Sequence, residues 1–135
     1  MKLLLFILLF SPCVLYSQEA PLLNEKLTTD EEIFMKAEEM PEFPGGYEGL
    51  AKYLSDSITY PAIAKEYNIQ GKVFVQFVVE KNGKVSNIKV VKGVDKNLDK
   101  EAVRVVQSLP DWKPGEQKGK AVRVLITIPI NFRLN

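Results

Sequence analysis

AVRVLITIPINFRLN, residues 121–135, ends the chain on an alternation of apolar residues. Because successive side chains of a strand point to opposite faces, this alternation predicts a strand with one face in the core. Pro129 lies inside the run and has no N–H to donate, which predicts that the strand lies at an edge of its sheet. The positions predicted to face the core are Val122, Val124, Ile126, Ile128, Ile130 and Phe132.

A β-hairpin is predicted upstream, in GKVFVQFVVEKNGKVSNIKVVK, residues 71–92. Its first arm alternates from Val73 to Val79, and the Asn82-Gly83 pair is typical of a tight reversal that needs positive φ. In the second arm the alternation slips between Val85 and Ile88, which indicates a bulge or an early twist.

Three helices are predicted from apolar residues at helical spacing. The first covers residues 45–58 and follows the turn-forming PEFPGG at 41–46. The second covers residues 61–67, where proline suits the first turn of a helix. The third covers residues 96–109, with Asp95 as its N-cap and Pro110 as its end.

The order helix, helix, strand, strand, helix, strand predicts an α+β domain. The hairpin and the C-terminal strand are expected to form a three-stranded antiparallel sheet, with the helices packed on one face. A crossover through residues 96–109 is long enough for strand 121–132 to pair antiparallel with strand 72–80. The first hairpin strand is then central, and the C-terminal strand is an edge.

The N-terminus has the features of an exported protein. Residues 1–17, MKLLLFILLFSPCVLYS, combine Lys2, a short apolar run and a final small residue, which predicts a secretory signal peptide cut between Ser17 and Gln18. Two other interpretations are lipidation of Cys13 and an uncleaved signal that acts as a weak membrane tether. Residues 18–37 are predicted as an acidic flexible leader with a helical fragment near residues 30–37, and residues 38–135 as the folded domain.

Several classes of chemistry are absent from the sequence. It has no histidine and a single cysteine, Cys13, which would leave with the signal peptide. It also lacks phosphate-binding, dinucleotide-binding and calcium-loop motifs, so we expect no enzyme activity, no cofactor and no metal. Basic residues are scattered rather than clustered with aromatic ones, which argues against a nucleic-acid partner. Trp112, beside Pro114, is interpreted as a core anchor of its loop, with an exposed recognition role as the alternative.

The predicted edge strand has two interpretations. Backbone N–H and C=O groups alternate in direction along a strand. If Pro129 faces the open side, an extended peptide could add there by β-augmentation. Alternatively, Pro129 with the flanking Arg123 and Arg133 only prevents aggregation through the edge. The residues whose backbone would be free for a visitor are Ala121, Arg123, Leu125, Thr127 and Asn131.

The whole pattern resembles the TonB C-terminal domain, especially the form found in Bacteroidetes-type bacteria. The resemblance covers residues 38–134 and lies in YPAIAKEYNIQGKVFVQFVVEKNGKVSNIKVVKG (60–93) and LDKEAVRVVQSLPDWKPGEQKGKAVRVLITIPINFRL (98–134). The lead-in EEMPEFPGGYEGLAKYL (38–54) is also similar. Its shared positions include Tyr60-Pro61, Asn82-Gly83, Trp112-Lys113-Pro114 and the closing Pro129–Phe132.

This resemblance implies a non-catalytic periplasmic domain that couples an inner-membrane, proton-driven motor to outer-membrane transporters. In the family, the terminal strand pairs with the short N-terminal box peptide of a transporter. Carried over to this sequence, the peptide-binding strand consists of Val122, Arg123, Val124, Leu125, Ile126, Thr127, Ile128, Ile130 and Asn131.

The sequence departs from a full transducer of this family, which has an N-terminal membrane helix and a long proline-rich spacer. Here a short signal precedes about 20 acidic leader residues, whose reach as a random coil is on the order of 25 Å. We therefore expect a periplasmic module that binds transporter boxes, and leave open whether it engages the motor proteins. The alternative is a structural or assembly module that forms a homodimer, or binds another envelope protein, through the same edge.

Overall fold

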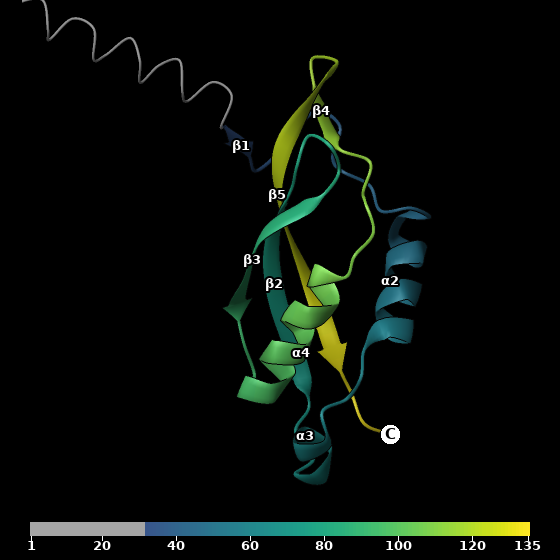
Figure 1. The fold of residues 1–135 in the computed structure, drawn as a ribbon, viewed down its shortest axis with the longest axis vertical. Helices are drawn as coiled ribbons and strands as arrows, with labels where there is room; N and C mark the ends of the chain where they lie inside the picture. The colour runs from purple at the N-terminus through teal and green to yellow at the C-terminus, as the bar shows by residue number, and fades with distance from the viewer. Residues whose placement is uncertain (1–31) are drawn as a thin grey trace, which may run out of the picture. The chain divides into compact units, whose positions relative to one another are not determined.

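The computed structural model describes residues 32–135 of the chain (Figure 1). The predicted signal peptide (1–17), its cleavage between Ser17 and Gln18 and the lipidation of Cys13 lie outside the described residues. The elements are β1 (Ile33–Phe34), α2 (Gly46–Ser57), α3 (Ala62–Glu66), β2 (Gly71–Val79), β3 (Val85–Lys92), α4 (Lys96–Gln107), β4 (Gly115–Gln117) and β5 (Lys120–Phe132). The three predicted helices and the three long strands are confirmed, whereas the helical fragment predicted near residues 30–37 is wrong because β1 lies there.

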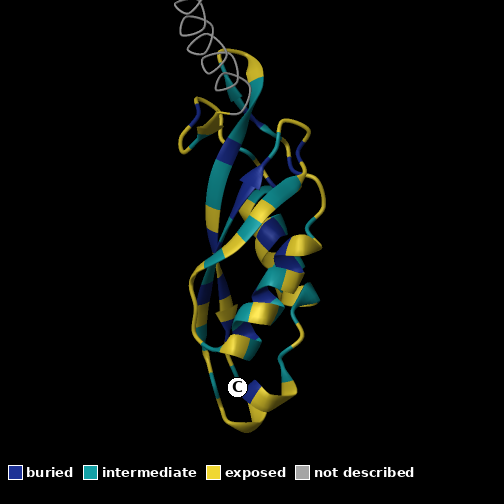
Figure 2. Cartoon of the chain, turned by 60° about the vertical axis from the view of Figure 1, so that its left-hand side comes forward, coloured by how far each residue is buried: buried dark blue, intermediate teal, exposed yellow. Residues whose placement is uncertain are grey.

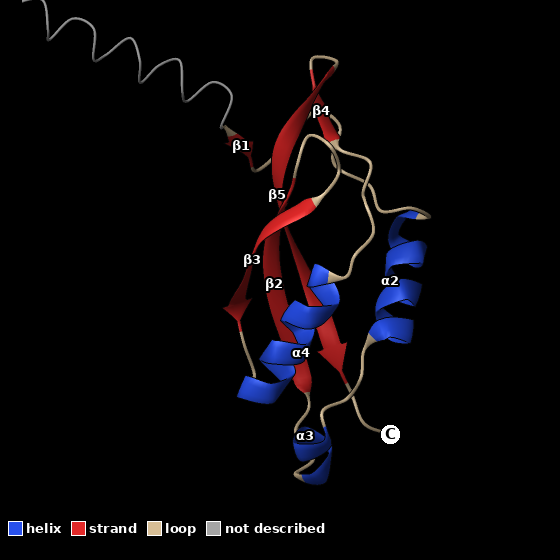
Figure 3. Ribbon diagram, in the orientation of Figure 1, coloured by secondary structure: helices blue, strands red, loops and turns tan. Residues whose placement is uncertain are grey.

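The sheet has the strand order β1-β5-β2-β3, and β4 pairs with the start of β5 (Figure 3). The antiparallel pairs β2–β3 and β2–β5 confirm the predicted position of β2 between the hairpin arm and the terminal strand. Two additions correct the predicted three-stranded antiparallel sheet: β1 pairs parallel with β5, and β4 forms a hairpin with it. Strands of two and three residues are too short for alternation to show, so no periodic signal marks them.

The pairing of β2 with β5 forms the centre of the sheet. It runs without a register shift from Gly71 opposite Phe132 to Val79 opposite Val124. Burial along the second half of β5 alternates as the sequence pattern predicts, and Figure 2 shows the same alternation. This ladder fixes which face of β5 is in the core.

The turn of the hairpin holds the loop that leads to β4. Gly83 has φ 86°, and a Cβ atom there would lie 2.1 Å from the Trp112 carbonyl oxygen, so only glycine fits. The Trp112 N–H donates to the Gly83 carbonyl at 2.8 Å. The predicted bulge in β3 is confirmed at Asn87, which has φ 51° beside a register shift. The hairpin therefore also positions the single tryptophan.

Helix α4 covers one face of the sheet, as Figure 1 shows. Its N-cap is the predicted one, because the Asp95 carboxylate accepts hydrogen bonds from the N–H groups of Asn97 and Leu98 at 2.9 and 3.3 Å. One stripe of the helix is fully buried and consists of Leu98, Ala102, Val105 and Val106. Leu98, Ala102 and Val106 belong to one core cluster with β2 and β5 residues that include Phe77, Ile130 and Phe132.

Two hydrogen bonds tie helix α2 and its C-cap region to α4 and the residue that follows it. The Tyr53 hydroxyl donates to the Ser108 carbonyl at 2.7 Å, and the Arg104 guanidinium donates to the Ser57 carbonyl at 2.8 Å. In Figure 1, α2 stands beside α4 instead of lying across the strands. Leu50 of α2 belongs to the core cluster, and Tyr53 and Leu54 pack against it, so α2 packs on the core beside α4.

Removing side-chain volume from the α4 stripe should destabilise the whole domain. For Val106→Ala, a fully buried site, we expect a loss of about 2 kcal/mol in the free energy of unfolding, from lost burial plus the cavity that remains. The matched control is Val91→Ala on β3, where the side chain is 45% exposed. Urea unfolding followed by circular dichroism measures both; equal losses in the two variants would contradict the packing described here.

Candidate functional site

The two edges of β5 differ in how they are paired. One edge faces β2 from Val124 to Phe132. The opposite edge, here called the outer edge, pairs with β1 at Arg123 and Val124. Among residues 32–135, no strand or backbone hydrogen bond occupies the outer edge from Leu125 to Asn131. This stretch is therefore a vacant edge.

Pro129 indicates which backbone groups face the vacant edge. It lies opposite Phe74 in a ladder without register shifts, and a proline fits there when its nitrogen points away from the partner strand. Because backbone groups alternate along a strand, Leu125, Thr127 and Asn131 share the direction of Pro129. Their N–H and C=O groups thus face outward and can pair with an added strand.

The vacant edge is shorter than the segment predicted from the sequence. Val122 pairs with Gly115 of β4, and Ala121 pairs with Glu116. Arg123 and Val124 pair with β1. Of the positions predicted to have free backbone groups, Arg123 is therefore already paired, because β1 is too short to be recognised by periodicity. Peptide binding at Val122, Arg123 and Val124 stays a prediction.

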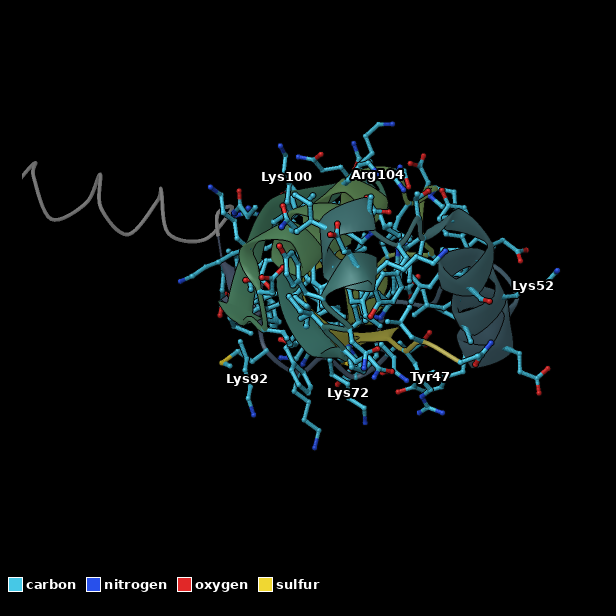
Figure 4. The ribbon with its side chains drawn as sticks, turned by 90° about the horizontal axis from the view of Figure 1, so that it is seen from below. Tyr47, Lys52, Lys72, Lys92, Lys100 and Arg104 are labelled. Carbon is cyan, nitrogen blue, oxygen red and sulfur yellow. The ribbon has the colours of Figure 1, made fainter. Side chains whose placement is uncertain are left out.

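An open hollow of about 610 Å³ lies along the vacant edge, and we call it the edge hollow. Four consecutive β5 residues, 125–128, line one side of it. Tyr47, at the start of α2 and labelled in Figure 4, also lines it. Charged side chains of Glu39, Glu42 and Lys113 also contribute to the lining. Its apolar lining outside β5 consists of Met40, Pro41, Phe43, Tyr47, Leu50 and Trp112.

The far wall of the edge hollow is built by the segment before α2. Glu42 and Lys113 exchange two backbone hydrogen bonds, of 3.0 and 2.8 Å, and this pairing holds the segment against the loop before β4. A Cβ atom at Gly49 would lie 2.3 Å from the Pro44 carbonyl oxygen. Glycine in the first turn of α2 therefore lets the helix pack directly on the PEFPGG turn.

Trp112 forms part of the edge hollow from the core side. It is only 7% exposed, and its ring contacts Phe43 and Phe77 edge-on, with centroids 5.5 and 5.6 Å apart. The predicted role as a core anchor is thus confirmed. Its buried indole Nε1 has no hydrogen-bond acceptor within the described part of the chain.

A second, smaller hollow of about 350 Å³ continues along the outer edge. β5 contributes Pro129, Asn131 and Phe132 to it, and α2 lines the opposite side with Leu54 and Ser55 among others. The two hollows together separate α2 from the outer edge over most of the vacant stretch. The helix therefore does not cover the backbone groups that β5 leaves unpaired.

The other border of the sheet, β3, is irregular. Its pairing with β2 shifts register twice, and Asn87 adopts a left-handed conformation. Exposed Lys89 and Lys92 also lie on this strand. Bulges and lysines are common devices against pairing with another chain. The regular edge of β5 is therefore better suited to accept a strand than the edge of β3.

A partly buried ion pair fixes the start of β5 against the end of β2. The Arg123 Nε and Nη2 atoms donate to the two Glu80 carboxylate oxygens at 2.8 and 3.1 Å. The Ser86 hydroxyl donates to the same carboxylate. The hydrogen bond from Arg123 holds the pKa of Glu80 below its ordinary value of 4.5, although burial opposes this shift. The pair anchors β5 immediately before its vacant edge.

The residues predicted as a peptide-binding strand lie in different surroundings in the structure. Leu125, Ile126, Thr127 and Ile128 line the edge hollow together, and Asn131 lines the smaller one. Val124 and Ile130 are fully buried in the core. Met40, Tyr47 and Leu50 also line the edge hollow, and no sequence signal indicated this, because the PEFPGG motif predicts a turn but not its neighbours in space.

Comparisons with known proteins agree with the fold. Residues 56–134 match the family model described as Gram-negative bacterial TonB protein C-terminal, which confirms the resemblance seen in the motifs. A solution structure of the TonB C-terminal domain from Helicobacter pylori is 26% identical, with a TM-score of 0.50, covering 64% of this chain and 78% of that one. A shorter form of the same domain is 27% identical, with a TM-score of 0.48, covering 63% and 89%. Among curated proteins, no match was found.

Residues 32–135 hold neither a membrane-spanning helix nor a cluster of metal ligands. None of the helices there has the length and apolar character needed to cross a membrane. No group of three or more His, Cys, Asp or Glu side chains in this part of the chain is arranged to hold a metal ion.

Replacing Glu80 by glutamine should make the stability depend less on pH. Because folding lowers the pKa of Glu80, the ion pair stabilises the fold above pH 4.5 and loses this effect as the pH falls through the lowered value. We expect Glu80→Gln to lose about 1–2 kcal/mol of unfolding free energy at neutral pH and little at about pH 3. The control is Asp56→Asn, which removes an exposed pair with Lys52. Urea unfolding at both pH values measures this; a constant difference between wild type and Glu80→Gln would contradict it.

Proposed function

Because the chain belongs to the family of Gram-negative bacterial TonB C-terminal domains, we propose that it binds the N-terminal box peptide of an outer-membrane transporter by strand addition at β5. The family is non-catalytic, acts in the periplasm and takes part in energy-coupled transport with outer-membrane transporters. The proposal for this chain includes export by a signal peptide at residues 1–17 and a binding domain at residues 38–135.

The observation that carries the proposal is the vacant edge of β5. An extended peptide laid beside Leu125–Asn131 would pair with the outward groups of Leu125, Thr127 and Asn131. Main-chain hydrogen bonds of this kind supply affinity without requiring a particular sequence. Pro129 has no N–H, so the row of outward backbone donors on β5 is interrupted at this position. The length of uninterrupted pairing is therefore short, which suits a box of a few residues.

The short strand β1 sets one limit of the binding segment. It already pairs with Arg123 and Val124, so an added peptide would have to stop at Leu125 or displace β1. A two-residue strand contributes few hydrogen bonds, and Ile33 is 38% exposed. We therefore expect the peptide to contact Leu125–Asn131 first.

A proline at position 127 tests the proposal directly. Thr127→Pro removes one outward N–H while leaving the pairing with β2 intact, as Pro129 already does. Loss of one hydrogen bond and the bulk of the ring should weaken binding of a transporter box peptide about fivefold or more. Isothermal titration calorimetry measures the affinity, and circular dichroism verifies the fold.

The matched control is Thr127→Val, which keeps the backbone N–H and favours a strand. It should bind the box peptide like the wild type. Equal affinity of Thr127→Pro and wild type would overturn strand addition at this edge. In the alternative function, two copies pair through the same edge; sedimentation at several concentrations would then show a dimer that Thr127→Pro dissociates.

A further inference from the structure

We propose that the edge hollow is a side-chain subsite that selects box peptides carrying a large apolar residue at one position. This inference builds on the proposed strand addition and adds the element that discriminates between peptides. Backbone pairing alone accepts most sequences, so a domain that recognises particular partners needs pockets for alternate side chains.

The edge hollow lies beside the first half of the vacant edge. It is lined by Leu125–Ile128, which form the first half of the vacant edge. A peptide paired with these residues would therefore run along its mouth. Its volume of about 610 Å³ lies within the range of roughly 300–1,000 Å³ that is typical of ligand sites.

The apolar lining of the hollow lies on the core face of the sheet. Along β5, the even-numbered residues Ile126 and Ile128 point to the face that holds the core, where Phe43, Leu50 and Trp112 also belong to the core cluster. Side chains of an added strand alternate between the same two faces. Every second peptide residue would thus point toward this apolar lining, and the residues between them would point to the opposite face.

Two apolar side chains that line the hollow are exposed to solvent. Met40 is 45% exposed and Tyr47 is 91% exposed, and both line the edge hollow. Methionine adapts to different shapes, and tyrosine is enriched at the centres of protein interfaces. Closing these two side chains over an apolar peptide residue would remove their exposed surface from water. An alanine at that position could not provide this contact.

The test is an alanine scan of the box peptide against three forms of the protein: wild type, Tyr47→Ala and Tyr67→Ala. Tyr67, 69% exposed after α3, provides the same substitution away from the edge hollow. Fluorescence of Trp112, the chain's single tryptophan, reports on the hollow, and its indole N–H, which has no acceptor among residues 32–135, provides a separate NMR signal.

We expect alanine to weaken binding to the wild type at alternate peptide positions, by about tenfold at the position that enters the hollow. Tyr47→Ala should weaken the unchanged peptide about fivefold but leave the peptide with alanine at that position unaffected. Tyr67→Ala should change neither affinity. This dependence of one substitution on the other identifies contact between Tyr47 and that peptide residue.

Two results would overturn the subsite and are distinguishable from failure of strand addition. If the amides of Leu125, Thr127 and Asn131 shift on titration but Tyr47→Ala weakens all peptides equally, or none, the peptide pairs with β5 and the hollow does not select it. If those amides do not shift at high peptide concentration, strand addition itself fails, and the subsite fails with it.

Discussion

The nine-residue ladder between β2 and β5 is the pairing on which the other features depend. It buries alternate side chains of both strands beneath α4 and runs without a register shift from Val124 to Phe132. A shift by one residue would turn every core side chain of β5 toward the solvent. The ladder also fixes the direction of Pro129, and through it the direction of the backbone groups on the outer edge. The vacant edge is therefore a consequence of how the core is formed.

The two borders of the sheet are protected in different ways. β3 is bulged at Asn87 and carries exposed lysines, which discourage pairing with another chain. β5 is regular over the same length, and β1 and Pro129 limit access to its outer edge. An unprotected regular edge would promote aggregation, so β1 at one end of the vacant stretch and Pro129 within it reconcile solubility with the ability to accept a strand.

The placement of α2 makes this stretch accessible. Hydrogen bonds from Tyr53 and Arg104 tie the helix region to α4, and the close approach of Gly49 to Pro44 fixes its start. The helix consequently stands off β5 and forms one wall of two hollows. The same arrangement leaves Tyr47 exposed beside the edge while burying Trp112 beneath it. Backbone groups for pairing and apolar side chains for selection thus lie next to each other.

The sequence by itself determined the long elements, since alternation in Val122–Phe132, the Asn82-Gly83 turn and the Asp95 cap are local signals that each specify one structure. It also placed β5 next to β2 and identified Pro129 as the mark of an edge. Only the tertiary structure decided how much of that edge is vacant, because β1 is too short for any periodic signal and pairs with β5 through contacts distant in sequence. The edge hollow was decided in the same way: Met40, Tyr47 and Leu50 meet Leu125–Ile128 across more than half of the described chain, and no local pattern encodes such a meeting.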